Sequence, residues 1–282
     1  MKSCQNVQES GVSVQQPIAI LDSGVGGLTV VKEVMRQLPR EKIMYFGDTA
    51  RTPYGPRPAE EVTRFTRQIV EYLIQYRPKM IVIACNTATA VALEDIRSRV
   101  AIPVVGVIHP GARAANGRTQ TGMVGVIGTE GTVRSGAYEQ ALKQLSPSTQ
   151  VYSLACPRFV PLVERGNFRS KETFDVVESS LQPLKERAID TLILGCTHYP
   201  FLSETIASVM GKDVALISSA DETAREISTI LHDRNRLTRE GELPVHQFFC
   251  SGDPRMFRMI AQEWLGEQIE LTPVVWQVPK IV

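Results

Sequence analysis

The order of strand-like and helix-like segments constrains the fold of this chain more than any single residue does. Short apolar runs, such as Ile18 to Leu21 and Met80 to Ala84, alternate with longer segments of helical pattern, such as Ala59 to Tyr76. Strands that alternate with helices indicate βαβ units and mostly parallel sheets. The sequence therefore predicts an α/β fold.

The same order of segments occurs twice along the chain. Residues 18–27 resemble residues 123–132, because each is a strand, a turn of small residues and the start of a helix, and residues 80–90 resemble residues 191–201 in the same way. A chain of 282 residues also favours about two domains. We expect two similar α/β domains with mostly parallel sheets, related by a pseudo-twofold axis and facing each other across a cleft.

Domain boundaries are weakly marked in the sequence. We place a polar, flexible tail at residues 1–16, a first domain at residues 17–108 and a second domain at residues 109–219. Residues 220–282 are expected to return to the first domain. That return is implied only by the family resemblance described below.

Composition narrows the class of protein. The 31 basic and 30 acidic residues give a net charge of +1, so no global surplus of charge favours a nucleic acid or a membrane as partner. No apolar stretch approaches the ~18 residues that span a bilayer, and residues 1–16 lack the apolar core of a secretory signal. The five widely spaced cysteines do not form the pattern of a disulfide framework, which favours a reducing compartment. We expect a cytoplasmic protein that acts on a small molecule.

Two cysteines end the two similar strand–helix units. Cys85 ends the run Met80 to Ala84, and Cys196 ends the run Thr191 to Gly195. Each is followed by two small hydrogen-bonding residues and then by a predicted helix, whose N-terminus would stabilise a thiolate. Ligands bind at the carboxyl ends of strands in open α/β sheets. One pocket with a sulfur on either side would suit moving a proton from one face of a carbon atom to the other.

Other interpretations of the two cysteines stay open at this point. Each cysteine alone is compatible with a small buried hydrophobic residue. A redox disulfide between them would need Cα atoms within about 7 Å. A zinc site is disfavoured, because Cys196 and His198 have no nearby Cys-x-x-Cys partner, and we predict no metal. Cys4, Cys156 and Cys250 lack the repeated context and are interpreted as structural.

The glycine-rich segment Asp22 to Gly27 does not match a nucleotide-binding loop. Its spacing departs from G-x-G-x-x-G, and no Gly-Lys-Ser/Thr follows. The N–H groups at the start of the next helix could bind a carboxylate, or Asp22 or Ser23 could simply cap that helix. The roles of His198 and Glu164 also stay open. His198 could be a packed histidine and Glu164 a solvated charge on a helix, or both could be partners of a catalytic thiol.

Four motifs in this order resemble the glutamate racemase family. The motifs are Leu21 to Leu28, Pro53 to Gly55, Ala84 to Ala88 and Leu194 to Pro200, and the stretch Cys156 to Glu164 matches the version found in Gram-positive bacteria. The resemblance spans roughly residues 18–275. It implies two α/β domains with the active site between them, and the cofactor-independent interconversion of L- and D-glutamate that supplies D-glutamate for peptidoglycan. We expect a homodimer.

The resemblance also assigns roles to residues. It implies that Cys85 is the base for D-glutamate and that Cys196 is the base for L-glutamate. Asp22, Glu164 and His198 would assist them. Substrate contacts are implied for Asp22, Ser23, Pro53, Tyr54, Gly55, Asn86, Thr87, Thr132, Thr197 and His198.

The chemistry of the residues agrees with this assignment. The α-proton of an amino acid is a far weaker acid than a thiol, so without a cofactor the site must stabilise a carbanion-like transition state with donors aimed at the α-carboxylate. One sulfur must be a thiolate while the other is a thiol. Two alternatives remain: an aspartate or related amino-acid racemase with the same machinery, and a non-enzymatic regulator that binds an amino acid. Two cysteines together with His198 favour catalysis, because a sensor needs no pair of thiols.

Overall fold

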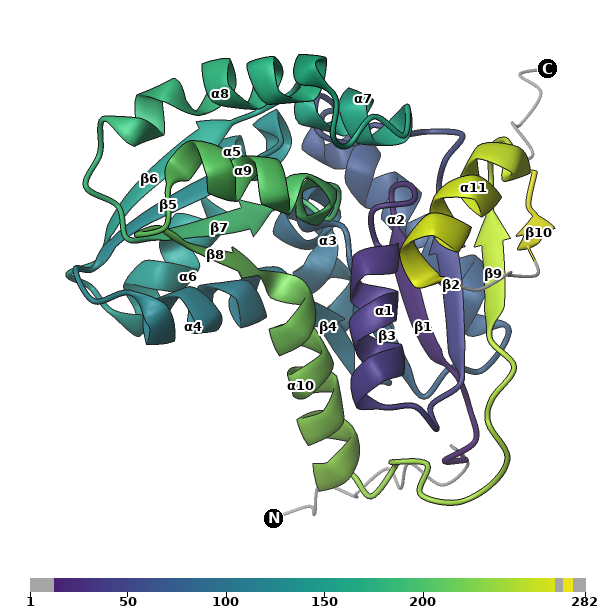
Figure 1. Cartoon of the computed structure of the whole chain (residues 1–282). Helices are drawn as coiled ribbons and strands as arrows, with labels where there is room; N and C mark the ends of the chain where they lie inside the picture. The colour runs from purple at the N-terminus through teal and green to yellow at the C-terminus, as the bar shows by residue number, and fades with distance from the viewer. Residues whose placement is uncertain (1–12, 267–270, 276–282) are drawn as a thin grey trace, which may run out of the picture.

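The computed structural model describes residues 13–266 and 271–275. They form two lobes, each built on a parallel β-sheet with helices on both faces (Figure 1). Most of the predicted tail at residues 1–16 lies outside the described residues. The strands are β1 (Ile18–Asp22), β2 (Ile43–Gly47), β3 (Met80–Ile83), β4 (Val104–Gly106), β5 (Met123–Gly128), β6 (Gln150–Ala155), β7 (Thr191–Gly195), β8 (Ala215–Ser218), β9 (Gln247–Cys250) and β10 (Leu271–Pro273).

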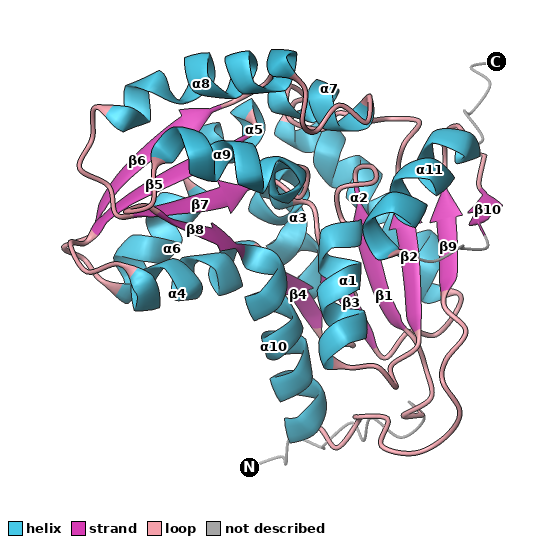
Figure 2. Ribbon diagram, viewed as in Figure 1, coloured by secondary structure: helices cyan, strands magenta, loops and turns pink. Residues whose placement is uncertain are grey.

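Helices connect successive strands, as expected for βαβ units. Figure 2 shows them on both faces of each sheet. The helices are α1 (Leu28–Gln37), α2 (Ala59–Ile74), α3 (Asn86–Arg99), α4 (Ile108–Arg118), α5 (Glu130–Ser135), α6 (Ala137–Leu145), α7 (Phe159–Glu164), α8 (Lys171–Lys185), the 3₁₀ helix η1 (Tyr199–Leu202), α9 (Ser203–Met210), α10 (Ser219–Asp233) and α11 (Pro254–Leu265).

The two sheets share one strand order. The first lobe contains β2-β1-β3-β4 with β9 and β10 added beyond β2, and the second lobe contains β6-β5-β7-β8. Every pair of neighbouring strands is parallel. The predicted fold class, two similar parallel-sheet α/β units, is therefore confirmed. The chain crosses to the second lobe between β4 and α4, and it returns between β8 and α10.

Strand β1 illustrates why these runs are apolar throughout. Ile18 and Ile20 pack in a core with residues of α1, α10 and α11, whereas Ala19 and Leu21 pack in a second core with residues of α2 and α3. Alternate side chains of a strand point to opposite faces, so a sheet covered on both faces needs apolar residues at consecutive positions. The second lobe repeats this plan, with α7, α8 and α9 on one face and α4 and α6 on the other.

The predicted N-cap of α1 is wrong, and the helix predicted after Cys196 begins as a 3₁₀ helix. Neither Asp22 nor Ser23 caps α1, because its N-cap is Gly27; instead, the Asp22 carboxylate accepts a hydrogen bond from the N–H of Gly24 at 3.0 Å. Cys196 is followed by the short 3₁₀ helix η1 and not directly by an α-helix. In that tight turn Tyr199 packs inward, and its hydroxyl donates to a backbone carbonyl at 2.9 Å. Only Cys85 therefore lies at the N-terminus of an α-helix.

A buried ion pair anchors the edge of the first lobe. The side chains of Lys79 and Glu41 pair with at most 2% exposure. Lys79 Nζ also donates to the carbonyls of Val14 at 2.6 Å and Arg236 at 2.9 Å, and Glu41 accepts from the N–H of Thr238 at 2.8 Å. The pair thus joins the segments before β1 and after α10 to the sheet. Buried charges need such partners, because each one loses its hydration.

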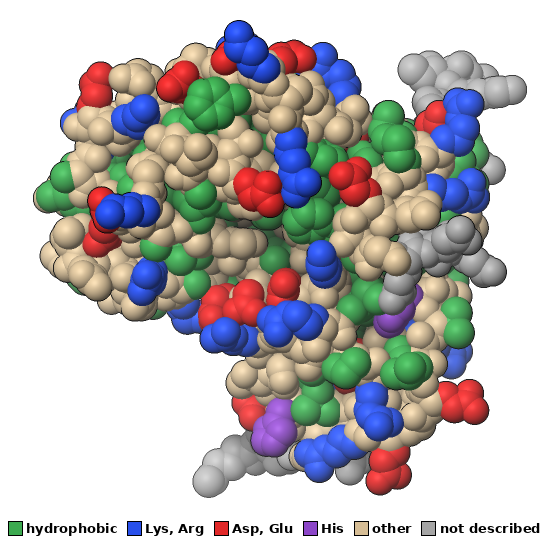
Figure 3. Space-filling view, in the orientation of Figure 1, with side chains coloured by type: hydrophobic (Ala, Val, Ile, Leu, Met, Phe, Trp, Pro, Cys, Tyr) green, Lys and Arg blue, Asp and Glu red, His purple; other side chains and the backbone are tan. Residues whose placement is uncertain are grey.

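The face of the molecule in Figure 3 shows no dominant charge of one sign. Lysine and arginine side chains are interspersed with acidic ones over the face in Figure 3. Among the described residues, no helix combines the length and apolar character that a membrane crossing requires.

We expect Lys79→Met to lower the free energy of unfolding by about 3–5 kcal/mol, because the substitution leaves Glu41 buried without its cation. Urea unfolding followed by circular dichroism measures the change. Lys143→Met is the matched control, since Lys143 forms an exposed pair with Glu139, and its effect should stay near 0.5 kcal/mol. Equal effects of the two substitutions would contradict the structural role of the buried pair.

Candidate active site

The two lobes enclose a small cavity at the carboxyl ends of equivalent strands. Residues that directly follow β1, β3, β5 and β7 reach it, and in both sheets these strands flank the point where the strand order reverses. Such switch points are where open α/β sheets bind ligands. The cavity has a volume of about 10 Å³. Its lining residues are Ser23, Thr52, Pro53, Tyr54, Gly55, Cys85, Asn86, Thr87, Thr129, Val160, Cys196, Thr197 and His198.

Cys85 and Cys196 thus line the same cavity, one from each lobe. Both are free thiols and both are buried. They occupy equivalent positions, because Cys85 follows β3 and Cys196 follows β7, the third strand of each shared order. The two sulfurs differ in their partners, however, and this difference matters for their chemistry.

Cys85 has uncharged hydrogen-bonding partners. Its Sγ lies 3.5 Å from the N–H of Ala88 in the first turn of α3 and donates to Ser23 Oγ at 3.6 Å. Burial, and then the nearby Asp22 carboxylate, raise the pKa of the Cys85 thiol to about 12. The helix N-terminus was expected to stabilise a thiolate here. It does act in that direction, but burial outweighs it, so Cys85 is a neutral thiol in this closed arrangement.

Cys196 has an ionisable partner. Its Sγ lies 3.8 Å from His198 Nδ1, and His198 Nε2 lies 2.6 Å from Glu164 Oε1. Burial by itself would lower the pKa of His198, but its hydrogen bonds to Cys196 and Glu164 outweigh burial and raise that pKa well above its usual value. A charged imidazole next to Sγ provides the counter-charge that a thiolate at Cys196 needs.

Asp22 connects the two lobes behind the cavity wall. Its side chain is fully buried and accepts hydrogen bonds from the N–H of Gly24 at 3.0 Å and from Thr197 Oγ1 at 3.2 Å. Burial raises the pKa of Asp22, although the charge of His198 and these hydrogen bonds act against it. A carboxylate in such a place is costly for stability, which is typical of a functional group.

Three threonines form a second contact between the lobes. The hydroxyl of Thr87 lies 2.8 Å from that of Thr129 and 3.2 Å from that of Thr132. Next to them, the N–H of Gly131 donates to the carbonyl of Gly55 at 2.8 Å. Thr132 therefore lies one hydrogen bond behind the cavity wall.

The loop around Pro53 to Gly55 forms part of the cavity wall. Tyr54 is 2% exposed, and its hydroxyl donates to the carboxylate of Asp48. The same carboxylate accepts from Arg51 and from Ser251, each at 2.6 Å. Asp48 thereby fixes the loop that closes this side of the cavity.

Most of the residues predicted from the sequence come together here. Asp22, Glu164 and Thr132 lie behind the wall and contact it through hydrogen bonds, and the other ten line it. The sequence prediction omitted three lining residues. Thr129 lies in the segment that matches the first glycine-rich turn, and Val160 lies in the matching stretch Cys156 to Glu164, so both positions could have been found. Thr52 carries no such signal.

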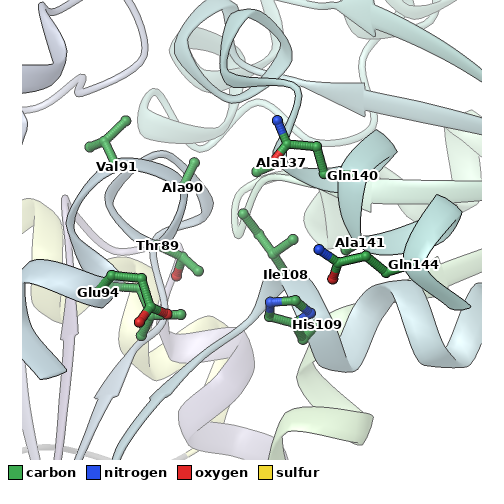
Figure 4. Close-up of a pocket in the computed structure, with 11 residues that line it drawn as sticks. Thr89, Ala90, Val91, Glu94, Ile108, His109, Ala137, Gln140, Ala141 and Gln144 are labelled. Atoms are coloured by element: carbon green, nitrogen blue, oxygen red, sulfur yellow. The ribbon is translucent and has the colours of Figure 1, made fainter.

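A larger groove between α3, α4 and α6 is separate from this cavity. Its volume is about 210 Å³, and Figure 4 shows side chains of the three helices facing one another across it. No cysteine lines this groove, and it shares no lining residue with the cavity. Cys85 and Cys196 therefore lie at the small cavity and not at this groove.

Comparisons with known proteins agree with the geometry. The family model described as Asp/Glu/Hydantoin racemase matches residues 22–227. A glutamate racemase of Bacillus cereus is 56% identical over 259 residues, which is 92% of this chain and 96% of that protein. The chain belongs to the Asp/Glu/hydantoin racemase family. It is therefore an amino-acid racemase, an isomerase, and the resemblance inferred from the four motifs is confirmed.

Solved structures of the family share the architecture. The glutamate racemase isoform RacE1 from Bacillus anthracis has a TM-score of 0.89 and 49% identity, covering 92% of this chain and 97% of that one. The glutamate racemase from Francisella tularensis, solved in complex with D-glutamate, has a TM-score of 0.86 and 35% identity, covering 93% and 98%. The similarity spans both lobes.

Asp22→Asn is expected to stabilise the fold near neutral pH. Because burial raises the pKa of Asp22 above its unfolded value of about 3.9, its favourable contribution is present below that value and is lost as the pH rises through the folded pKa. Asparagine has no charge to bury. The difference in unfolding free energy between variant and wild type should therefore grow from about pH 4 upward. A difference that is independent of pH would contradict this reading.

Proposed function

We propose that the protein interconverts L- and D-glutamate by direct proton transfer at Cα, with Cys85 and Cys196 as the two bases and without a cofactor. The observation that carries the proposal is that the two thiols line one cavity from opposite lobes. Glutamate as the substrate is supported by the names of the related enzymes. The product D-glutamate would serve peptidoglycan synthesis, with the enzyme acting in the cytoplasm as a homodimer.

The different partners of the two sulfurs support different protonation states for them before L-glutamate reacts. Cys196 beside the His198–Glu164 pair is suited to be the thiolate, while Cys85 is the thiol. The Cys196 thiolate removes the α-proton of L-glutamate, and the Cys85 thiol then delivers its own proton to the opposite face. The product is D-glutamate, and the protonation states of the two sulfurs have been exchanged. D-glutamate reacts by the same steps in reverse.

The substrate carbanion needs stabilisation between the two transfers. Asn86, Thr87 and Thr197 line the cavity next to the cysteines, and α3 begins at Asn86. Side-chain donors and the N–H groups of a helix N-terminus can hold a carboxylate and the negative charge that develops on it. Asp22 accepts from Thr197 Oγ1 and so orients that side chain.

The size of the cavity implies movement of the lobes. A volume of about 10 Å³ accommodates roughly one water molecule, and glutamate is far larger. The lobes must therefore separate to admit the substrate. The hydrogen bonds from Thr197 to Asp22 and between Thr87 and Thr129 join the lobes directly, so they would break on opening and form again on closing. Closure excludes water, which strengthens the electrostatic contacts within the site.

Cys85→Ser and Cys196→Ser should each lower the rate of racemisation roughly 100- to 10,000-fold, because each removes one proton-transfer group. Circular dichroism measures the conversion of pure L- or D-glutamate. In heavy water, the Cys196→Ser variant should still exchange the α-proton of D-glutamate for deuterium, but not that of L-glutamate. The Cys85→Ser variant should exchange the α-proton of L-glutamate only. Offering aspartate in the same assay distinguishes the alternative substrate.

Cys250→Ser is the matched control, since Cys250 is a buried free thiol at the end of β9 and does not line the cavity. It should racemise at the wild-type rate. Full activity of either active-site variant in both directions would contradict the two-thiol mechanism.

His198→Asn should make proton transfer at Cys196 the slow step, because Cys196 loses its ionisable partner. The deuterium isotope effect on kcat/KM should then increase for L-glutamate deuterated at Cα and decrease for D-glutamate deuterated at Cα. Initial rates with the four substrates measure both effects. Changes of the same sign in the two directions would show that His198 does not act specifically on Cys196.

A further inference from the structure

In the side-chain amide of Asn86, the oxygen accepts a hydrogen bond but the nitrogen has no acceptor among the described residues. Asn86 is 2% exposed and lines the cavity. Its Oδ1 accepts a hydrogen bond from the hydroxyl of Tyr138 at 2.7 Å. Its Nδ2 is buried and has no hydrogen-bond partner among the described residues. A buried donor without a partner is costly, so such an atom at a binding cavity indicates a ligand that supplies the acceptor.

The hydroxyl of Tyr138 has one hydrogen, and it donates this hydrogen to the amide oxygen of Asn86. The side chain is 2% exposed, and burial raises the pKa of Tyr138 well above its usual value, so the hydroxyl stays protonated. A hydrogen bond with the Ser219 side chain acts against burial on this pKa. The protonated Tyr138 hydroxyl donates its single hydrogen to Asn86 Oδ1 at 2.7 Å.

The Tyr138 hydroxyl lies between the two connections of the lobes. Ser219 is the first residue of α10, where the chain returns to the first lobe, and Gly111 belongs to α4, where it has just left. A Cβ atom at Gly111 would lie 3.2 Å from the Tyr138 hydroxyl and 3.0 Å from Ser219 Cβ. Glycine therefore permits this close approach. Figure 4 shows Ala137 and Ala141 of α6, the neighbours of Tyr138, facing α3 and α4.

We propose that Tyr138 is a positioning residue that holds the Asn86 amide with Nδ2 toward the substrate carboxylate. The proposal rests on the proposed glutamate racemisation. If the amide turned over, Oδ1 would face the carboxylate and repel it. Because Tyr138 belongs to the second lobe and Asn86 to the first, the bond also links the orientation of the donor to closure. The carboxylate contact is then complete only in the closed state.

Tyr138→Phe removes only the hydroxyl and tests the proposal. We expect kcat/KM for glutamate to fall roughly 10- to 100-fold, because the donor is no longer fixed. In the Asn86→Ala background the same substitution should change kcat/KM less than about twofold, because Tyr138 acts through Asn86. Tyr152→Phe is the matched control, since its hydroxyl donates to Gln150 within β6 and the residue does not line the cavity, and it should keep wild-type kinetics.

Ser219→Ala keeps the proposal testable if Tyr138→Phe does not fold. Without the Ser219 hydroxyl beside it, the Tyr138 oxygen can accept from Nδ2, so the amide can turn over and kcat/KM should fall several-fold. That loss should also disappear in the Asn86→Ala background. Wild-type kinetics of both variants, or equal losses with and without Asn86, would overturn the proposal.

A spectroscopic measurement separates this proposal from the proposed function. In nitrogen-15 spectra, the signals of the Asn86 side-chain amide are identified by their absence in Asn86→Ala. Tyr138→Phe should move these signals in the free protein, and D-glutamate should shift them less than in wild type. Unmoved signals overturn the role of Tyr138. Inactivity of the wild-type protein with glutamate overturns the proposed function, whereas moved signals in the free protein would still support the Tyr138–Asn86 contact.

Discussion

The enclosure of ionisable groups between two lobes is the constraint on which the rest of the structure depends. Asp22, His198 and both cysteines are at most 6% exposed. Their hydrogen-bond partners are other groups of the site, among them Ser23, Glu164 and Thr197. Burial removes water from these groups and therefore makes each charge sensitive to its nearest neighbours. The helices that cover both faces of each sheet supply the apolar cores that compensate for this cost.

The two thiols show how one plan can give two environments. Both end the third strand of a shared strand order, but only Cys85 is followed directly by an α-helix. The tight turn after Cys196 brings His198 Nδ1 to its sulfur, and α7 brings Glu164 to the other side of the ring. A small difference in local backbone thus gives one sulfur uncharged partners and the other an ionisable partner. A two-base reaction needs this inequality at every moment of its cycle.

The sequence predicted the parts of the structure that depend on periodic apolar patterns and missed those that depend on contacts between distant segments. The helix predicted from Ala59 to Tyr76 is α2, because its apolar residues recur at helical spacing. The predicted N-cap of α1 was wrong, because the Asp22 carboxylate accepts hydrogen bonds from Gly24 of its own lobe and from Thr197 of the other lobe. The helix N-terminus acts on the pKa of Cys85 in the predicted direction, but burial outweighs it, and the degree of burial is not visible in a linear pattern. Tyr138 gave no signal at all, as its partner is 52 residues away.

The shared strand order has a consequence for energetics. Enantiomers of an amino acid have equal free energies, so a catalyst for their exchange gains nothing by favouring one over the other. Two equivalent strand ends reach one cavity from scaffolds of the same topology, as the proposed two-base reaction requires. Because the two lobes share a topology, small local changes are enough to make the barriers to proton transfer equal on the two faces of the substrate. A duplicated scaffold is therefore a direct structural route to a reversible enzyme.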